Sequence, residues 1–244
     1  METSYPIRIN KYLAMKNYST RVGADELIKK GLVSINGRKA VLGDKVYEED
    51  KVVVITKGSK KEYVYYAYNK SINVSTNPDP NSKDILQVTR FPSRVFPVGR
   101  LDKDSHGLII LTNDGRVTDR LLSPKYVHEK EYVVKVEPTF SDNFIELMKN
   151  GVHFDGFISK KCEVWRKTTS AKASASQSKD TFHIILTEGK KRQIRRMCEA
   201  LHHKVIDLRR IRVMNVEIGK IQPGEYREIK GKELDEFLKL LQLQ

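Results

Sequence analysis

The amino-acid sequence predicts an α+β protein in which a small N-terminal module precedes a larger domain with a mainly antiparallel mixed sheet and flanking helices. Strand patterns in the larger part follow one another without the regular strand–helix alternation that builds a parallel sheet. The first sixty or so residues instead combine two short basic helices with a small sheet, which is too little chain for a large core. A polar stretch separates these two parts.

The composition changes near residue 60, where residues 56–63 are polar and contain glycine and several lysines. Such a stretch is typical of a linker. We therefore predict a binding module over residues 1–58, a linker over residues 59–64 and a main domain over residues 65–244.

The chain carries 45 lysine and arginine residues against 31 acidic residues, a net charge of +14. The excess is spread along the sequence, which indicates a folded surface that meets a polyanion, nucleic acid first and an anionic membrane second. No apolar run approaches the ~18 residues that span a bilayer, and the N-terminus has no apolar signal-peptide core. Two well-separated cysteines, Cys162 and Cys198, favour a reduced cytoplasmic protein without a metal site.

In the N-terminal module, apolar residues at helical spacing over residues 7–19 predict a first helix. A second helix is expected to begin after an N-cap at Ser19 or Thr20 and to end at Gly31. The dipeptide Asn36-Gly37 between alternating residues predicts a β-hairpin, and a further strand pattern follows it. The pattern as a whole indicates a small basic binding module.

The main domain is expected to contain many strands and a few interspersed helices. Strands are predicted at residues 63–70, 108–112, 131–137, 160–167 and 181–189, and helices at residues 141–151, 194–201 and 232–243. Between the last two strands, residues 168–180 are rich in serine, alanine and lysine. This composition predicts a flexible loop between paired strands, without chemistry of its own.

The stretch GRLDKDSHGLIILTNDG, residues 99–115, places Asp102 on a polar loop that leads into an apolar strand. A rigid strand can hold a loop side chain in position for polar chemistry. The same residue types also fit an acid that caps a turn or pairs with Arg100, because aspartate is a common turn former. From these residues alone, both interpretations stand.

A second charged stretch, EGKKRQIRRMCEALHH at residues 188–203, combines an apolar helical face with several arginines. Arg195 would lie in the first turn of this helix, where the helix dipole disfavours a cation. We therefore expect a compensating acid or a bound phosphate nearby. A basic surface helix that grips an RNA backbone fits the residues equally well.

Residues 8–54 resemble the S4 RNA-binding domain. The stretches RINKYLA, STRVGADELIKKGLVSINGRKA and GDKVYEEDKVVV carry this resemblance. In that family the two helices form a surface that faces anions, so the resemblance implies RNA contact by this module. The phosphate contacts that it implies are Arg8, Lys11, Arg21, Lys29, Lys30 and Arg38.

The motifs GRLDKDSHGLIILTNDG, HEKEYVV and EGKKRQIRRMCEA occur in the order seen in RsuA/RluF-type pseudouridine synthases, a resemblance that covers nearly the whole chain. The stretches KKCEV and RIRVMNV are most similar to the RluF branch of that family. The resemblance implies an enzyme that isomerises a uridine of ribosomal RNA, in the large subunit, to pseudouridine without cofactor or metal. A cytoplasmic monomer with no membrane partner is the simplest expectation.

The same resemblance assigns roles to individual residues. Asp102 would be the catalytic aspartate, Tyr132 the aromatic residue that packs on the uracil ring, and Arg195 the basic partner of the aspartate. The RNA contacts implied in this domain are Arg100, Arg192 and Arg196. Two other functions fit the sequence: a non-catalytic S4-domain protein of RNA binding or ribosome assembly, and a synthase that acts on 16S ribosomal RNA or transfer RNA.

The implied chemistry explains why these residue types occur together. Isomerisation needs no redox change, and one ionised carboxylate can attack the sugar, attack the ring or remove a sugar proton. Burial raises the pKa of a carboxyl group, and a neighbouring guanidinium opposes this effect. We therefore predict that Arg195 lies directly against Asp102.

Overall fold

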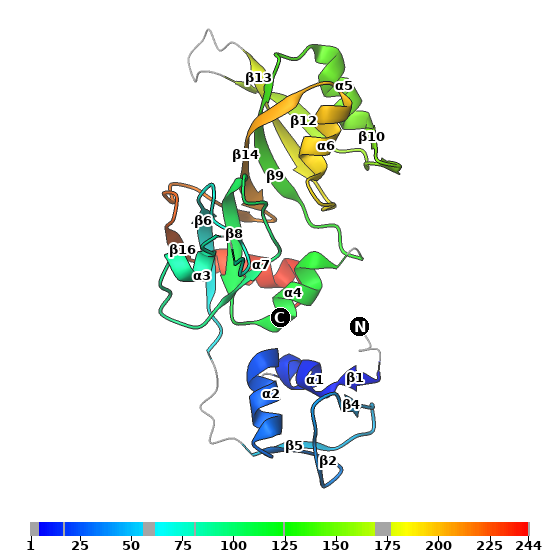
Figure 1. Ribbon diagram of the computed structural model, residues 1–244, viewed down its shortest axis with the longest axis vertical. Coiled ribbons are helices and arrows are strands. Elements are labelled where there is room, and N and C mark those ends of the chain that lie inside the picture. Colours follow the sequence, from blue (N-terminus) through cyan, green and yellow to red (C-terminus); the bar gives the residue numbers. More distant parts are fainter. Residues whose placement is uncertain are drawn as a thin grey trace.

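The computed structural model describes residues 5–16, 18–55, 62–80, 82–123, 125–168 and 177–243. Figure 1 shows the N-terminal module at one end of the molecule and a larger, two-lobed domain at the other. None of the helices in these stretches has the length and apolarity needed to cross a bilayer. Most of the predicted serine-rich loop and the first half of the predicted linker lie outside the described residues.

The N-terminal module packs two short helices against small antiparallel strands. Its elements are β1 (Ile7–Arg8), α1 (Ile9–Met15), α2 (Arg21–Lys29), β2 (Val33–Ile35), β3 (Arg38–Lys39), β4 (Lys45–Val46) and β5 (Val52–Val54). Thr20, and not Ser19, is the N-cap of α2, because its hydroxyl accepts a hydrogen bond from the Gly23 amide at 3.1 Å. Leu13 and Ile28 belong to the small core between the helices. The predicted hairpin is confirmed, since β2 pairs with β3.

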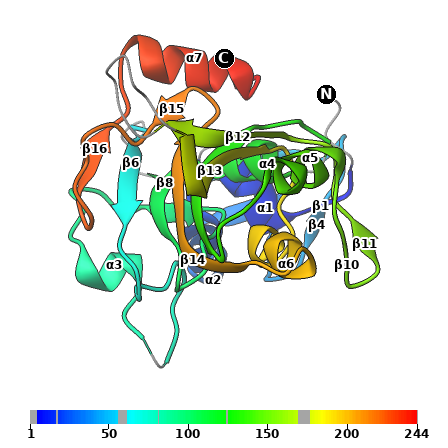
Figure 2. The same cartoon turned by 90° about the horizontal axis from the view of Figure 1, so that it is seen from above.

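One twisted sheet runs through both lobes of the larger domain (Figures 1 and 2). Its strands are, in spatial order, β12 (Glu163–Thr168), β13 (Gln177–Leu186), β9 (Lys130–Glu137), β14 (Lys204–Val213), β8 (His106–Thr112), β6 (Tyr65–Lys70) and β16 (Tyr226–Glu228), with β15 (Val216–Glu217) on β14 and β7 (Phe96–Val98) on β8. Within the described residues, β14 and β8 run parallel and the other pairs of this sheet are antiparallel. The predicted α+β class is therefore confirmed.

Helices cover the sheet in two groups, one in each lobe. They are α3 (Ile85–Val88), α4 (Gly115–Leu122), α5 (Asp142–Asn150), α6 (Gln193–Ala200) and α7 (Lys232–Leu240), and a small hairpin of β10 (His153–Phe154) and β11 (Phe157–Ile158) follows α5. One core lies between α5, α6 and the strands β9, β12, β13 and β14, with Phe144, Phe182 and Met197 at its centre. A second core lies between α4, α7 and the strands β6 and β8, with Leu108 and Phe237. We call the lobe with the first core, at the top of Figure 1, the upper lobe, and the lobe with the second core the lower lobe. The two lobes therefore have separate cores on one sheet.

The lobes meet where β8 and β14 run side by side over a short parallel contact, with Arg209 opposite His106 and Arg210 opposite Gly107. Gly107 has a φ of +104°, and a Cβ atom at this position would overlap the backbone of Arg210. Glycine is required because it alone tolerates both this dihedral and this approach. The loop that carries Asp102 leads directly into β8, so this contact fixes where the loop ends.

The variant Gly107→Ala is expected to lower the free energy of unfolding by more than ~2 kcal/mol, because a backbone collision adds to the ~1–2 kcal/mol cost of a left-handed residue. Urea unfolding measures the loss. Gly219→Ala is the matched control, since Gly219 has a φ of +55° and no atom lies within 4 Å of an added Cβ. Equal losses in the two variants would show that the β8–β14 contact imposes no constraint.

Candidate active site

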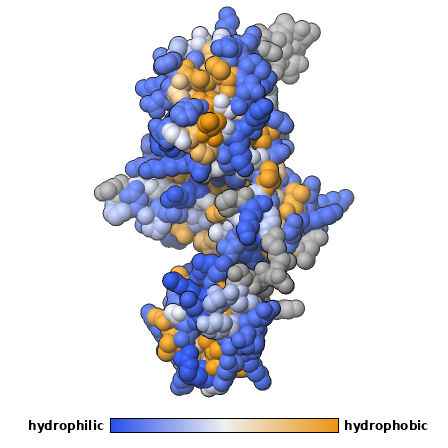
Figure 3. All heavy atoms as spheres, turned by 90° about the vertical axis from the view of Figure 1, so that its right-hand side faces the viewer, coloured by the Kyte–Doolittle hydropathy of each residue, from blue (hydrophilic) through white to orange (hydrophobic). Residues whose placement is uncertain are grey.

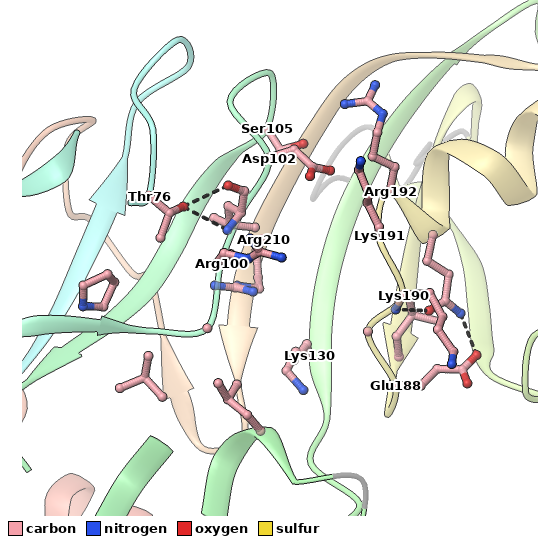
Figure 4. Close-up of a pocket in the computed structure, with 18 of the residues that line it drawn as sticks. Thr76, Arg100, Asp102, Ser105, Lys130, Glu188, Lys190, Lys191, Arg192 and Arg210 are labelled. Atoms are coloured by element: carbon pink, nitrogen blue, oxygen red, sulfur yellow. Dashed lines mark hydrogen bonds between the residues drawn. The ribbon is translucent and has the colours of Figure 1, made fainter. Parts of the chain in front are cut away.

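A cleft of about 1380 Å³ opens between the two lobes. Its walls come from the loop after β7, the start of β9, the end of β14, the β10–β11 hairpin and the segment before α6. Pockets for small ligands usually measure ~300–1,000 Å³, so this cleft has room for a segment of a polymer. Asp102 from one wall and Arg192 from the other point into the space between them (Figure 4).

The loop of Asp102 is held by backbone and side-chain hydrogen bonds. The amide of Ser105 donates to the carbonyl oxygen of Asp102 at 3.0 Å and closes a tight turn. The Thr76 hydroxyl donates to the Leu101 carbonyl at 2.8 Å and accepts from the Leu101 amide at 3.0 Å. These bonds leave the half-buried side chain of Asp102 directed into the cleft.

Lys70 lies fully buried behind this loop. Its ammonium donates to the carbonyl oxygens of Ser71 at 2.9 Å and Val74 at 2.7 Å. Burial lowers the pKa of Lys70 to about 8, against the opposing charges of Asp104 and Asp102. A buried cation beside the loop therefore contributes a positive potential at the carboxylates.

Arg195 does not pair with Asp102, so the predicted direct contact is wrong. Among the described residues its ion pair is with Asp104, at 3.3 Å from Nε to the carboxylate. Its guanidinium also donates to the Asp104 carbonyl at 2.9 Å, the Ser105 hydroxyl at 3.2 Å and the Val205 carbonyl at 3.2 Å. The tight turn after Asp102 explains the difference, because it directs Asp104 toward the start of α6. Arg195 holds the loop of Asp102 rather than its carboxylate.

Asp104 is the acid that compensates the cations at the start of α6. Arg192, the N-cap residue, donates to both of its carboxylate oxygens, at 3.1 and 2.9 Å. Burial alone would raise the pKa of Asp104, but the hydrogen bond from Arg192 and the charge of Arg195 outweigh burial and hold the pKa below its usual value. The expected compensating acid is therefore present two residues after Asp102.

Tyr132 lies on β9 opposite Arg210 of β14 and lines the cleft. Its half-buried ring also packs against the core of the upper lobe. The site therefore combines an aromatic face with the carboxylate of Asp102 across the same space.

The sequence did not predict two cations of the cleft, Lys130 and Arg210. Lys130 precedes Tyr132 by two residues on β9 and faces the same side, and Arg210 of β14 is only 4% exposed. Arg100, Arg210 and Lys130 lie toward one wall, whereas Lys190, Lys191 and Arg192 come from the other (Figure 4). The two-residue period of the HEKEY strand could have revealed Lys130, but Arg210 required the strand register.

The basic residues of the N-terminal module divide into two groups. Arg8, Lys29 and Lys30 are exposed. Lys11 and Arg21 instead reach Asp119 of α4, at 3.7 and 3.8 Å. A third predicted contact, Arg38, pairs with Asp44 at 2.8 Å. Hydrophilic side chains cover much of the surface drawn in Figure 3.

The remaining predicted contact of α6, Arg196, pairs with Asp155 of the β10–β11 hairpin and lies 4.8 Å from the centre of the Phe154 ring. It therefore braces the hairpin at the cleft rim. No group of histidine, cysteine and acidic side chains suited to a metal ion occurs in the described stretches. Burial raises the pKa of Cys162 to about 11 and that of Cys198 to about 12, so neither thiol ionises near neutral pH.

Known proteins resemble the chain over nearly its full length. A family model described as RNA pseudouridylate synthase matches residues 59–200, and the S4 domain model matches residues 7–52. Over 247 residues, covering 99% of this chain and 82% of the relative, the chain is 38% identical to a Salmonella typhi protein named dual-specificity RNA pseudouridine synthase RluF. It is 35% identical over 237 residues to ribosomal large subunit pseudouridine synthase B of Bacillus subtilis, with 93% of each chain covered.

A solved structure, described as the crystal structure of pseudouridylate synthase, matches the fold with a TM-score of 0.67 at 26% sequence identity. The match covers 96% of this chain and 99% of that one, so it includes both the N-terminal module and the larger domain.

The variant Arg195→Ala is expected to lower the free energy of unfolding by about 2–3 kcal/mol, because it removes charged hydrogen bonds that hold the loop of Asp102. Urea unfolding measures the loss, and hydrogen exchange at residues 102–105 should rise. Arg192→Ala is the matched control, because Arg192 also binds Asp104 but its side chain is 42% exposed; we expect a loss of at most ~1 kcal/mol. If Arg195→Ala were as mild as the control, Arg195 would not hold the loop.

Proposed function

Because this chain belongs to the RNA pseudouridylate synthase family, we propose that the cleft is its active site and that Asp102 carries the reaction. The protein is an RNA pseudouridine synthase, an isomerase. The observation that supports Asp102 is its half-buried side chain on a braced loop, directed into a large cleft with basic walls. We further propose ribosomal RNA of the large subunit as the substrate, which agrees with the name of the Bacillus subtilis relative.

The target uridine must leave its stack before a cleft residue can reach it. Extrusion of a base costs a few kcal/mol in a duplex and less in a loop. Tyr132 offers an aromatic face on which the uracil ring can stack, a contact worth roughly 1–3 kcal/mol. With the base on Tyr132, the ribose is expected to lie toward Asp102 and the backbone along the basic walls.

The reaction breaks the bond between ribose C1′ and uracil N1, and joins C1′ to C5 of the turned base. The C5 proton then leaves and N1 gains a proton, so atoms and electrons balance without a redox partner. Attack on the sugar, attack on the ring and removal of a sugar proton all require an ionised carboxylate. The positive charges of Lys70 behind the loop and of Arg192 across the cleft interact electrostatically with the Asp102 carboxylate.

Arg195 acts through the loop in this proposal. By binding Asp104 and Ser105 it fixes the turn that follows Asp102. A carboxylate held in one place raises the fraction of bound uridines in reactive geometry. We therefore assign Arg195 a positioning role and Asp102 the catalytic role.

The S4 module would bind RNA phosphates at a distance from the cleft. Arg8, Lys29 and Lys30 are the proposed contacts, because their side chains are exposed and form no ion pair within the described residues. Lys11 and Arg21 reach Asp119 instead, and so help to seat the module on α4. We propose that the protein is a monomer, since RNA accounts for the basic surface. We also propose that it is cytoplasmic and works without cofactor.

RNA labelled with tritium at uracil C5 should release label to water in the presence of this protein. Asp102→Asn keeps the shape of the side chain but removes its charge, and release should fall on the order of 10³-fold or more. Asp142→Asn, on the exposed surface of α5, should release label at the normal rate. Normal release by Asp102→Asn would exclude Asp102 as the reacting carboxylate, whereas no release by the unmodified protein would favour a non-catalytic RNA-binding role.

The double variant Lys29→Gln with Lys30→Gln should raise the KM for RNA on the order of tenfold at low salt, because phosphate contacts dominate affinity. The value of kcat should change less than about twofold, since these residues lie outside the cleft. Arg38→Gln is the matched control and should have a smaller effect, because Asp44 already compensates its charge. An unchanged KM in the double variant would remove this pair from the RNA surface.

A further inference from the structure

Two cations on the cleft wall, Lys130 and Arg210, lack acidic partners among the described residues. The Nε atom of Arg210 donates to the Leu108 carbonyl at 2.7 Å, and the Lys130 ammonium reaches the His128 carbonyl at 3.3 Å. Neither forms an ion pair with an acid within the described part of the chain. The other cations near Asp102 differ in this respect, since Arg192 and Arg195 share Asp104.

The unpaired charges of Lys130 and Arg210 are electrostatically unfavourable as long as the cleft holds no anion. Arg210 is 4% exposed, and buried charges in proteins are normally paired. Burial, and next the charge of Arg210, lower the pKa of Lys130 to about 8. A buried guanidinium and a half-buried ammonium, close together and without an acid, therefore match a site whose counter-charge is supplied by a ligand.

We propose that Lys130 and Arg210 form a phosphate subsite that binds one phosphodiester of the RNA backbone beside the extruded uridine. The inference rests on the proposed function for the identity of the ligand. Arg210 lies opposite Tyr132 in the strand register, and Lys130 is on the same face two residues away. A base stacked on Tyr132 would therefore bring its backbone to these cations. A guanidinium binds phosphate oxygens in a bidentate manner and an ammonium adds a point charge.

Arg100 completes the subsite at its mouth. It is exposed and, in Figure 4, lies beside Arg210 on the same wall as Lys130. An exposed guanidinium can follow the backbone in and out of the cleft, while Lys130 and Arg210 fix the final position of the phosphate. Specific placement of the phosphodiester would in turn set the distance from Asp102 to the ribose.

The subsite predicts a dependence of RNA affinity on pH. Lys130 carries its charge below a pH of about 8 and loses it above, so affinity should fall as the pH rises through this value. The groups around it are Arg210 on β14, Arg100 and Asp102 on the loop after β7, Tyr132 on β9, Tyr126 and His128 before β9, and Glu188 and Lys190 on the opposite wall. Lys70, which interacts with Arg210 and Asp102, also has a pKa of about 8, and substitution of Lys130 separates the two lysines. Burial lowers the pKa of His128, so this imidazole is already neutral where Lys130 titrates.

Lysine side-chain NMR of the full chain tests the subsite without any turnover. The Lys130 signal, assigned by Lys130→Gln, should titrate near pH 8, and saturating dimethyl phosphate should move its midpoint upward. Inorganic phosphate should act in the same way, and Arg210→Gln should abolish the shift. A midpoint that neither phosphate moves would overturn the proposal. These results do not depend on tritium release, so the proposed subsite and the proposed reaction can be refuted independently of each other.

Binding of a short oligouridylate to the Asp102→Asn protein supplies the second test. Lys130→Gln should weaken binding on the order of ten- to hundredfold at neutral pH and reduce the salt slope by about 0.7, as for one lost phosphate contact on a single strand. Lys130→Arg should keep affinity at high pH, where the unmodified side chain loses it.

The matched control is Lys135→Gln, because Lys135 lies on the same strand but on the opposite face, where it reaches Asp180 at 3.5 Å. The Lys135→Gln variant should bind the oligouridylate with the same affinity and the same salt slope as the parent protein. If Lys130→Gln behaved like this control, or if Lys130→Arg showed the same loss at high pH as the parent, the subsite would be refuted.

Discussion

The contact between Arg195 and the loop at residues 102–105 is the interaction on which the site depends. It joins the upper lobe, through α6, to the loop that leads into β8 of the lower lobe. The only direct parallel contact between β8 and β14 spans two residue pairs among the described strands. Without a second tie across the cleft, the two walls could separate or slide. Arg195 supplies such a tie because it binds Asp104, Ser105 and the Val205 carbonyl together, and the hydrogen bonds from Arg192 to Asp104 add to it.

This tie separates two tasks that a direct ion pair would have combined. An arginine bound to the reacting carboxylate would orient it, but would also occupy oxygens that the substrate needs. By using Asp104 as the bound acid, the chain leaves Asp102 without a side-chain ion pair in the described structure. Two positive groups interact with it electrostatically without a direct ion pair: Lys70 behind the loop and Arg192 across the cleft. The carboxylate is thus oriented through its backbone and remains open to the cleft.

The sequence predicted the fold class, the two-part organisation and the loop that carries Asp102, because these follow from local patterns. The period of the strands, the Asn36-Gly37 turn and the apolar face of α6 are all legible over a few residues. The predicted partner of Arg195 was wrong because Asp102 and Asp104 are only two positions apart in the sequence. The turn closed by the Ser105 amide decides which of them faces α6. Arg210 was missed because its meeting with Tyr132 depends on the register between distant strands.

The distribution of acids on the basic surface explains how one chain can be strongly cationic and still fold. Some cations are paired with acids of the chain itself, and these ion pairs connect its parts: Arg192 pairs with Asp104 and Lys11 with Asp119. Lys130 and Arg210 are the opposite case, since their burial opposes folding as long as no anion is present. For Lys130 the folded pKa of about 8 lies below its ordinary value, so below that pH the unfolded state is favoured by this group and bound phosphate reverses the effect. The cleft therefore gives up part of its own stability to gain affinity for the RNA backbone at neutral pH, where Lys130 is protonated.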